Sequence, residues 1–280
     1  MIKVTAIQTG TVTIKSAQAA GREGRSAVQR KIDMLKDTTW TDPLPILCYL
    51  IEHPEGRFMV DTGDTWRNSV PGYLPRWNPF YTREVLVKVA PHEEVGERLR
   101  DLGIDSARDI TAVLMTHMHH DHAGGIHNFP HARFIVPRQN WKVARSLAGM
   151  VQGNLPQRWP SWLKPELIEP LASSVGPFET SYPVTTDGRI VMVPTPGHAK
   201  GHMSVIVRDT EVSYFITGDA TYDEKNLRAD LVDGVTYDPD VSKRSQALIR
   251  KYAASHPTII LPAHDFHAAA RLAAEQVYAT

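Results

Sequence analysis

Four histidines and one aspartate occur within six residues of this chain, directly after a short apolar run. Residues 117–122 read His-Met-His-His-Asp-His, and residues 111–116 before them read Thr-Ala-Val-Leu-Met-Thr, which predicts a buried strand. Imidazole and carboxylate groups suit Zn²⁺ and similar ions. Residues two apart in an extended segment point the same way, so His117 and His119 can reach one ion. The aspartate and the last histidine of the cluster, past a bend, can turn towards another ion.

A pair of ions needs more ligands than this cluster supplies. Three further candidates each follow an apolar run that predicts a strand: His198 after residues 190–193, Asp219 after residues 213–217 and His264 after residues 258–261. A polar loop rich in histidine, or a single structural metal site, is the alternative interpretation of the cluster alone.

Predicted strands outnumber predicted helices, and helices occur in both halves of the chain. This pattern favours a layered α/β arrangement with helices outside the sheets. A hairpin is expected at the N-terminus, with strands 3–8 and 11–15 joined by a turn at Thr9-Gly10. Residues 16–36 are polar and read as a solvated, partly helical surface segment or, alternatively, as a dimer arm. The other expected strands are 46–51, 57–60, 133–136 and 204–207, and the expected helices are 92–102, 139–147, 242–254 and one from about 266.

Charge and cysteine content exclude several classes of protein. Lys+Arg and Asp+Glu are equal at 31 each, so no basic excess is available to bind a nucleic acid along its length. Cys48, the single cysteine, lies in an apolar run and is expected to be a buried strand residue rather than a nucleophile.

No stretch approaches the roughly 20 apolar residues of a membrane span, and the N-terminus lacks the apolar core of a signal peptide. A cytoplasmic protein without membrane contact is the expectation.

Five segments resemble, in order along the chain, the motifs of the metallo-β-lactamase superfamily: Asp61-Thr62-Gly63, the cluster 117–122, Thr195-Pro196-Gly197-His198, Gly218-Asp219 and Pro262-Ala263-His264. The resemblance implies an αββα sandwich, in which two mixed β-sheets pack face to face with helices on the outer faces. It also implies that residues 1–280 form a single domain of this type.

The same resemblance implies two divalent metal ions with Asp61 as an acceptor that orients a ligand imidazole. His120 has no ligand role in that pattern, and His202 is expected to pack beside the site. Zn²⁺ is the first expectation for the metal, with Co²⁺, Mn²⁺ or Fe²⁺ as alternatives. The implied ligands are His117, His119 and His198 on the first ion, Asp121, His122 and His264 on the second, and Asp219 between the two.

Tyr222 follows the bridging carboxylate by three residues, which resembles the N-acyl homoserine lactonase branch of the superfamily, the quorum-quenching lactonases. The resemblance implies a small-molecule lactone as substrate, opened by attack of a metal-bridging hydroxide on the ring carbonyl. Tyr222 would stabilise the oxyanion, and Asp121 or Asp219 would relay the proton. The alternatives are a glyoxalase II-like thioesterase, another lactonase or esterase such as a pyridoxolactone hydrolase, and a non-catalytic metal-binding scaffold.

An acyl chain requires an apolar groove. Large aromatic side chains on irregular segments are the candidates for its wall. We expect Trp66, Trp77, Phe80 and Trp159 to line the pocket, although the same residues could simply anchor long loops to the body of the protein.

Overall fold

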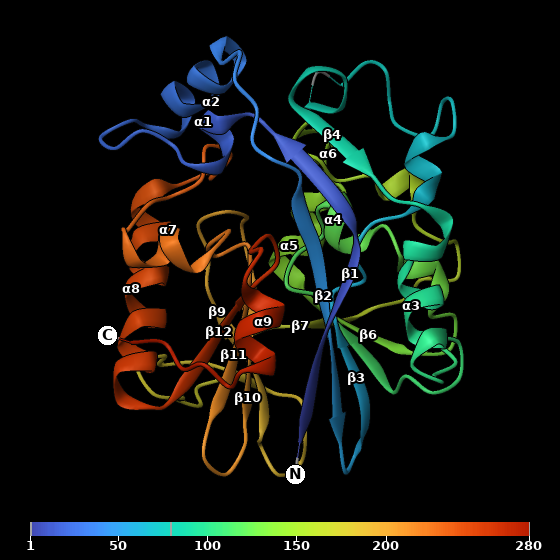
Figure 1. Ribbon diagram of the computed structural model, residues 1–280, viewed down its shortest axis with the longest axis vertical. Helices are drawn as coiled ribbons and strands as arrows, with labels where there is room; N and C mark the ends of the chain where they lie inside the picture. Colours follow the sequence, from blue (N-terminus) through green and yellow to red (C-terminus); the bar gives the residue numbers. More distant parts are fainter. Residues whose placement is uncertain (1, 79, 280) are drawn as a thin grey trace.

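The computed structural model describes residues 2–78 and 80–279, and within them the strands form two mixed sheets (Figure 1). The first sheet has the order β4-β1-β2-β3-β5-β6-β7 and the second the order β12-β11-β10-β9-β8. The strands of the first sheet are β1 (Lys3–Ile14), β2 (Leu44–His53), β3 (Gly56–Val60), β4 (Val85–Lys88), β5 (Ala112–Leu114), β6 (Arg133–Pro137) and β7 (Glu166–Ile168). Those of the second sheet are β8 (Tyr182–Pro183), β9 (Ile190–Pro194), β10 (Met203–Arg208), β11 (Ser213–Gly218) and β12 (Thr258–Pro262).

The helices lie outside the two sheets. They are α1 (Ser16–Ala19), α2 (Ala27–Lys36), α3 (Val95–Asp101), α4 (His120–Ala123), α5 (Arg138–Ala144), α6 (Leu147–Val151), α7 (Glu224–Arg228), α8 (Pro239–Ser255) and α9 (Ala268–Ala273). Short 3₁₀ turns cover Trp66–Ser69, Pro91–Glu93, Ile126–Asn128 and Pro156–Arg158, and a π-helical turn covers Phe80–Glu84. Among the described residues, every helix falls short of the length and apolar character that crossing a membrane would require.

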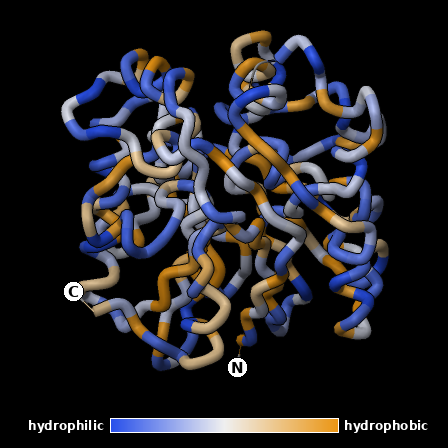
Figure 2. The backbone as a smooth tube through the Cα atoms, turned by 45° about the horizontal axis from the view of Figure 1, so that its top comes forward, coloured by the Kyte–Doolittle hydropathy of each residue, from blue (hydrophilic) through white to orange (hydrophobic). Residues whose placement is uncertain are grey.

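Strand β2 is apolar along most of its length because both of its faces are covered. Leu47 and Tyr49 point into the core between the sheets, whereas Cys48 and Leu50 pack on the outer side with Leu99 of α3. Successive side chains of a strand point to opposite faces, so a strand between two layers needs apolar residues at every position. Figure 2 shows the hydrophobic segments along the central strands and the hydrophilic ones mainly around them. The expected buried position of Cys48 is confirmed.

The second sheet is covered in the same way by α8. Phe215 of β11 packs against Ile249 and Tyr252 of that helix, on the face opposite the core between the sheets. The predicted αββα sandwich of two mixed sheets is therefore confirmed.

The direction of the strands brings the candidate site together. Strands β3 and β5 are parallel, and β9, β11 and β12 share one direction because β10 is antiparallel to its two neighbours while β12 is parallel to β11. The carboxyl ends of parallel strands meet at the same edge of a sheet. The segments that follow these ends carry Asp61, the cluster 117–122, His198, Asp219 and His264.

The expected N-terminal hairpin is wrong. Residues 3–14 form one continuous strand, β1, with a register shift between Gln8 and Thr11 in its pairing with β2. Gly10 has φ +87°, a left-handed conformation that serves a β-bulge here rather than a turn. The half of β1 beyond the bulge also pairs with β4, which the sequence did not predict.

Two expected helices are broken, and one surface segment is not free. Residues 92–102 divide because Glu94 is extended with ψ 148°, so that α3 begins at Val95. Residues 139–147 divide between α5 and α6. In the segment 16–36, Met34 and Arg30 are buried, and the Arg30 guanidinium donates to the backbone oxygen of Val232 at 2.9 Å. The segment is packed on the chain itself.

Candidate metal centre

Three imidazoles meet at one point of the site. Nδ1 of His119 lies 2.9 Å from Nε2 of His117 and 3.0 Å from Nε2 of His198. Nitrogen ligands about 2.0 Å from a tetrahedral zinc ion lie about 3.3 Å apart. The three side chains therefore have nearly the spacing that a common cation would impose, and none of them needs to move far to share one.

A second set lies beside the first. Nε2 of His264 is 3.4 Å from Oδ2 of Asp121, and Nε2 of His122 is 3.9 Å from Oδ1 of the same carboxylate. Ligand atoms of these three residues all lie within 4.8 Å of one another. The mixed imidazole and carboxylate set is again a donor set that suits zinc and related ions.

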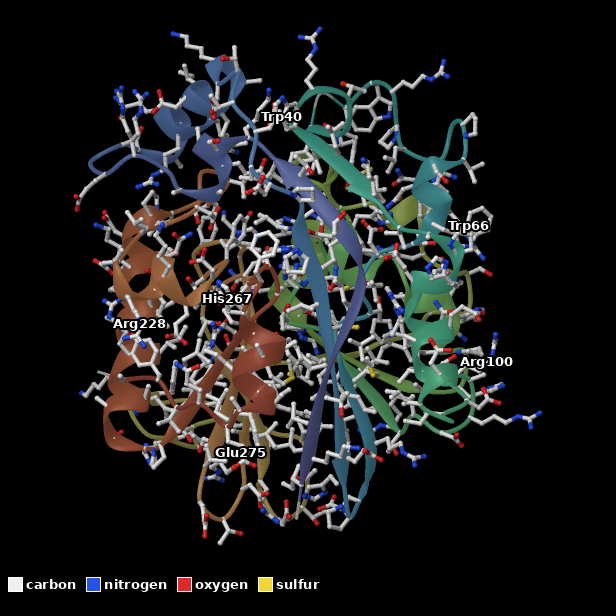
Figure 3. All side chains as sticks on the ribbon, viewed as in Figure 1. Trp40, Trp66, Arg100, Arg228, His267 and Glu275 are labelled. Atoms are coloured by element: carbon white, nitrogen blue, oxygen red, sulfur yellow. The ribbon has the colours of Figure 1, made fainter. Side chains whose placement is uncertain are left out.

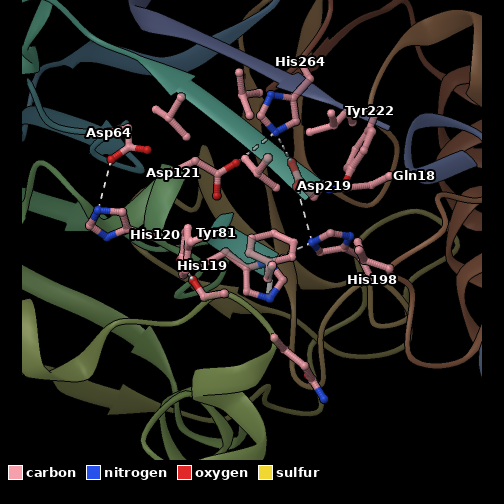
Figure 4. Close-up of a pocket in the computed structure, with 18 residues that line it drawn as sticks. Gln18, Asp64, Tyr81, His119, His120, Asp121, His198, Asp219, Tyr222 and His264 are labelled. Atoms are coloured by element: carbon pink, nitrogen blue, oxygen red, sulfur yellow. Dashed lines mark hydrogen bonds and ion pairs between the residues drawn. The ribbon is translucent and has the colours of Figure 1, made fainter. Parts of the chain in front are cut away.

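The Asp219 carboxylate lies between the two sets. Its Oδ1 is 3.2 Å from Nε2 of His122 and 3.5 Å from Nε2 of His264. Its Oδ2 is 3.3 Å from Nε2 of His198 (Figure 4). Each of the two carboxylate oxygens thus faces a different set of ligands. The structure brings together all seven side chains that the sequence singled out as ligands.

Two buried atoms at this point lack a hydrogen-bond partner. Nε2 of His122 and Oδ1 of Asp219 are both inaccessible to solvent, and neither makes a hydrogen bond of good geometry within the described residues although they face each other at 3.2 Å. A buried polar atom without a partner is costly, and a cation between these atoms would remove that cost. The residues present therefore fit a metal centre.

The charges at the site favour a cation as well. Burial opposes the charged form of His264, but the carboxylates of Asp219 and Asp121 outweigh burial and raise the pKa of His264 to about 10. Burial, followed by the neighbouring imidazole of His198, lowers the pKa of His119 to about 3, so His119 is neutral at pH 7 and ready to act as a ligand. The two carboxylates thus create an environment that favours positive charge.

Hydrogen bonds on the far side of the rings set their orientation. Oδ2 of Asp61 accepts from Nδ1 of His122 at 2.8 Å, and the same carboxylate accepts from the backbone N–H and the hydroxyl of Thr116. Nδ1 of His264 donates to the backbone oxygen of Pro45 at 2.9 Å. With Nδ1 engaged, each ring presents Nε2 to the centre.

Asp233 orients the imidazole of His198 in the same way, and the sequence did not predict this role. Its Oδ2 accepts from Nδ1 of His198 at 3.2 Å, and its two oxygens also accept from Thr236 and from the backbone N–H of Val235. The only local signal was the dipeptide Asp233-Gly234, which is typical of a turn. Its contact with His198 spans 35 residues.

Replacing Asp233 with asparagine should weaken metal binding by about 10- to 100-fold, because a partner that orients a ligand imidazole typically contributes that much. Competition with a chromogenic chelator measures the affinity. Asp238→Asn is the matched control, since Asp238 caps α8 through an oxygen that asparagine retains. If the Asp233→Asn protein binds metal as tightly as the Asp238→Asn protein, Asp233 does not contribute to metal binding.

Tyr222 lies against both sets of ligands. Its ring centre is 5.1 Å from that of His264 and 5.8 Å from that of His198, and its side chain lines the cavity over the site with His119 and Asp121. Burial, followed by the nearby carboxylates, raises its pKa well above the usual value. The phenol is therefore protonated at neutral pH and can donate a hydrogen bond into the cavity.

The two remaining histidines near the site have partners of their own. Nε2 of His120 faces Oδ1 of Asn68 at 2.9 Å and Oδ1 of Asp64 at 3.2 Å. Nε2 of His202 accepts from the backbone N–H of Asp219 at 3.2 Å. His202 thus packs beside the carboxylate that lies between the two sets.

Only one of the four expected pocket aromatics lines the cavity. Phe80 does so. Trp66 and Trp77 are exposed by 36% and 61%, and Trp66 lies at the periphery of the molecule (Figure 3). Trp159 stacks on Trp141 with ring centres 4.7 Å apart and packs against the core beneath the first sheet. Trp66 and Trp77 thus face solvent outside the lining of the cavity, and Trp159 anchors its segment to the body of the protein.

A family model described as the metallo-beta-lactamase superfamily matches residues 41–264. The chain is 28% identical over 224 residues to the N-acyl homoserine lactonase AttM of Agrobacterium fabrum, covering 79% of this chain and 82% of that protein. Its structure resembles that of an N-acyl homoserine lactone hydrolase with N-hexanoyl-L-homoserine at its catalytic metal centre, with a TM-score of 0.73, 22% identity and coverage of 95% and 94%. It also resembles AidC, a dizinc quorum-quenching lactonase, with a TM-score of 0.63, 14% identity and coverage of 95% and 88%.

Proposed function

The chain belongs to the metallo-beta-lactamase superfamily, and we propose that it hydrolyses the lactone ring of N-acyl homoserine lactones. The observation that carries the proposal is the position of Tyr222, a buried hydroxyl donor beside two adjoining sets of metal ligands. The lactonase AttM, a relative at 28% identity, supports this choice of substrate. We further propose that residues 1–280 act as one domain.

We propose that the seven side chains described above hold two divalent ions, and that zinc is the preferred metal. When bound, such a pair of ions lowers the pKa of water and polarises the carbonyl group that the water attacks. Asp219 can serve both ions because each of its oxygens faces one set of ligands. The orienting contacts of Asp61 and Asp233 hold the imidazoles in place before a substrate arrives.

In the proposed reaction, the oxygen of water adds to the ring carbonyl carbon and the ring C–O bond breaks. The hydroxyl of Tyr222 donates a hydrogen bond to the carbonyl oxygen as negative charge develops on it. Asp121 accepts the proton of the attacking water and passes it to the departing alkoxide. Its side chain lies at the cavity and is 25% exposed. Asp219, buried between the two sets, is the less accessible proton carrier. The product is a ring-opened hydroxy acid.

A substrate panel tests the proposal. Purified protein of measured metal content is assayed with an N-acyl homoserine lactone, a pyridoxolactone, a glutathione thioester and a β-lactam. We expect kcat/KM for the acyl homoserine lactone to exceed the others by at least about 100-fold, or about 2.7 kcal/mol of differential transition-state stabilisation. A higher value for the thioester would reassign the protein to glyoxalase II-like chemistry. Metal binding with no hydrolysis would indicate a non-catalytic scaffold.

Phe80 and Trp159 should differ in their effect on long acyl chains. Phe80 lines the cavity, so Phe80→Ala should lower kcat/KM about tenfold for a long-chain substrate and much less for a short one, because the lost apolar contact is made only by the chain. Trp159→Ala should affect both substrates alike, since its ring packs on Trp141. A chain-length dependence in the Trp159 variant and none in the Phe80 variant would reverse these assignments.

A further inference from the structure

A second cavity, of about 200 Å³, adjoins the one over the metal ligands. It extends towards α2 and α6 and shares five lining residues with that cavity, namely Phe80, His119, Gln152, His198 and Val235. In Figure 1 these two helices lie at the same end of the molecule as β4. We call this second cavity the groove. The rest of its wall combines the apolar side chains of Met34, Leu35 and Val151 with the charged side chains of Lys31 and Glu84.

One carboxylate lies in this wall. Glu84, at the end of the π-helical turn Phe80–Glu84, lines the groove and is 8% exposed. Within the described part of the chain, no hydrogen bond or ion pair reaches its side-chain oxygens, which are open to solvent in the groove. A carboxylate that loses its water without gaining another donor is costly, and an ionised one can accept several hydrogen bonds.

The surrounding charges restrict what Glu84 can bind. Burial raises the pKa of Glu84, while Lys15 and Lys31 act on it from a distance in the opposite direction. The ammonium group of Lys15 makes a cation–π contact with Trp40, 3.7 Å from the centre of the ring. Lys31 also lines the groove. An ammonium group entering the groove would meet the like charge of Lys31, whereas a neutral hydroxyl would not be repelled.

We propose that Glu84 determines substrate specificity by accepting a hydrogen bond from a hydroxyl group on the acyl chain, which lies along the groove. This inference rests on the proposed lactonase function and names the class of acyl chain. An unsubstituted chain would displace water from Glu84 without replacing its hydrogen bonds, so binding it costs more. A hydroxylated chain satisfies the carboxylate and still buries its methylene groups against Met34 and Val235.

The test compares acyl homoserine lactones of one chain length that carry no hydroxyl, a 3-hydroxyl or a hydroxyl nearer the chain end. For the wild-type protein we expect kcat/KM to be about tenfold or more higher for at least one hydroxylated substrate, the usual range for a hydrogen bond to a charged group. In Glu84→Leu the preference should disappear, and the unsubstituted chain should improve. Glu84→Gln, which keeps the shape and one acceptor oxygen, should retain part of the preference.

A control variant and a binding measurement show whether the preference for a hydroxylated chain depends on Glu84 itself. Glu211→Leu removes an exposed glutamate from the turn between β10 and β11 and should leave the preference unchanged. Calorimetric binding of the ring-opened products should show the same order of affinities without turnover. If the protein opens both kinds of lactone equally, or if Glu84→Leu keeps the preference, the role of Glu84 is refuted while the lactonase proposal stands. If it opens no acyl homoserine lactone, both fail.

Discussion

Replacing Tyr222 with phenylalanine is expected to lower kcat for an acyl homoserine lactone by about 10²- to 10³-fold, the usual effect of removing one donor to a developing oxyanion. The substitution removes a single oxygen atom. The ring that packs against His198 and His264 remains, so the ligands keep their positions. Metal content, measured by plasma mass spectrometry, should stay at the wild-type value, and KM should change less than kcat.

The matched control is Tyr252→Phe. Tyr252, on the inner face of α8, is also buried, and its hydroxyl lies 3.1 Å from that of Ser213, away from the cavity. It should keep the wild-type kcat. A Tyr222→Phe enzyme within about threefold of wild type would show that the hydroxyl does not assist the transition state, because an oxyanion donor is worth far more than that.

Replacing Asp219 with asparagine is expected to reduce both the metal content and the rate, with kcat falling by about 10³-fold or more. Each oxygen of the carboxylate faces one set of ligands. An asparagine has one oxygen and one NH₂ group, so whichever way it turns, a donor faces a cation at one set. The chain also loses the negative charge between the sets. A bound metal contributes several kcal/mol to catalysis, and each 1.36 kcal/mol corresponds to about tenfold in rate.

Asp230→Asn is the control for the loss of one negative charge. Asp230 lies outside the site, pairs with Arg250 at 3.0 Å and has φ 55°, a conformation that asparagine tolerates. We expect it to retain wild-type metal content and activity. An Asp219→Asn protein that kept a full complement of metal, with turnover to match, would exclude the bridging role proposed for this carboxylate.

The ligand candidates were predictable because each follows a local pattern. An apolar run forms a buried strand, and a histidine or aspartate at its end lies at the edge of a sheet. The runs before Asp219 and His264 formed β11 and β12 as expected, with parallel pairing that aligns their ends. Residue type then sets the chemistry, since imidazole and carboxylate bind the same borderline cations.

Features that depend on distant segments were not predictable. Asp233 reaches His198 across 35 residues of chain, and nothing in its own neighbourhood distinguishes it from an ordinary turn aspartate. Trp77 and Trp159 were expected in the pocket because of their size, yet an aromatic side chain serves equally well as an anchor. Gly10 favoured a turn, while pairing of β1 with both β2 and β4 made it a bulge.

By itself, therefore, the sequence determined the layered α/β architecture, the strand-end positions of the candidate ligands and the kind of ion they suit. These follow from periodicity and side-chain chemistry, which are properties of short segments. The tertiary structure alone decided that Asp233 orients His198, which segments form the wall of the groove and that Glu84 lies there without a partner among the described residues. Those features arise where segments remote in sequence pack together, and burial, not local pattern, sets their energies.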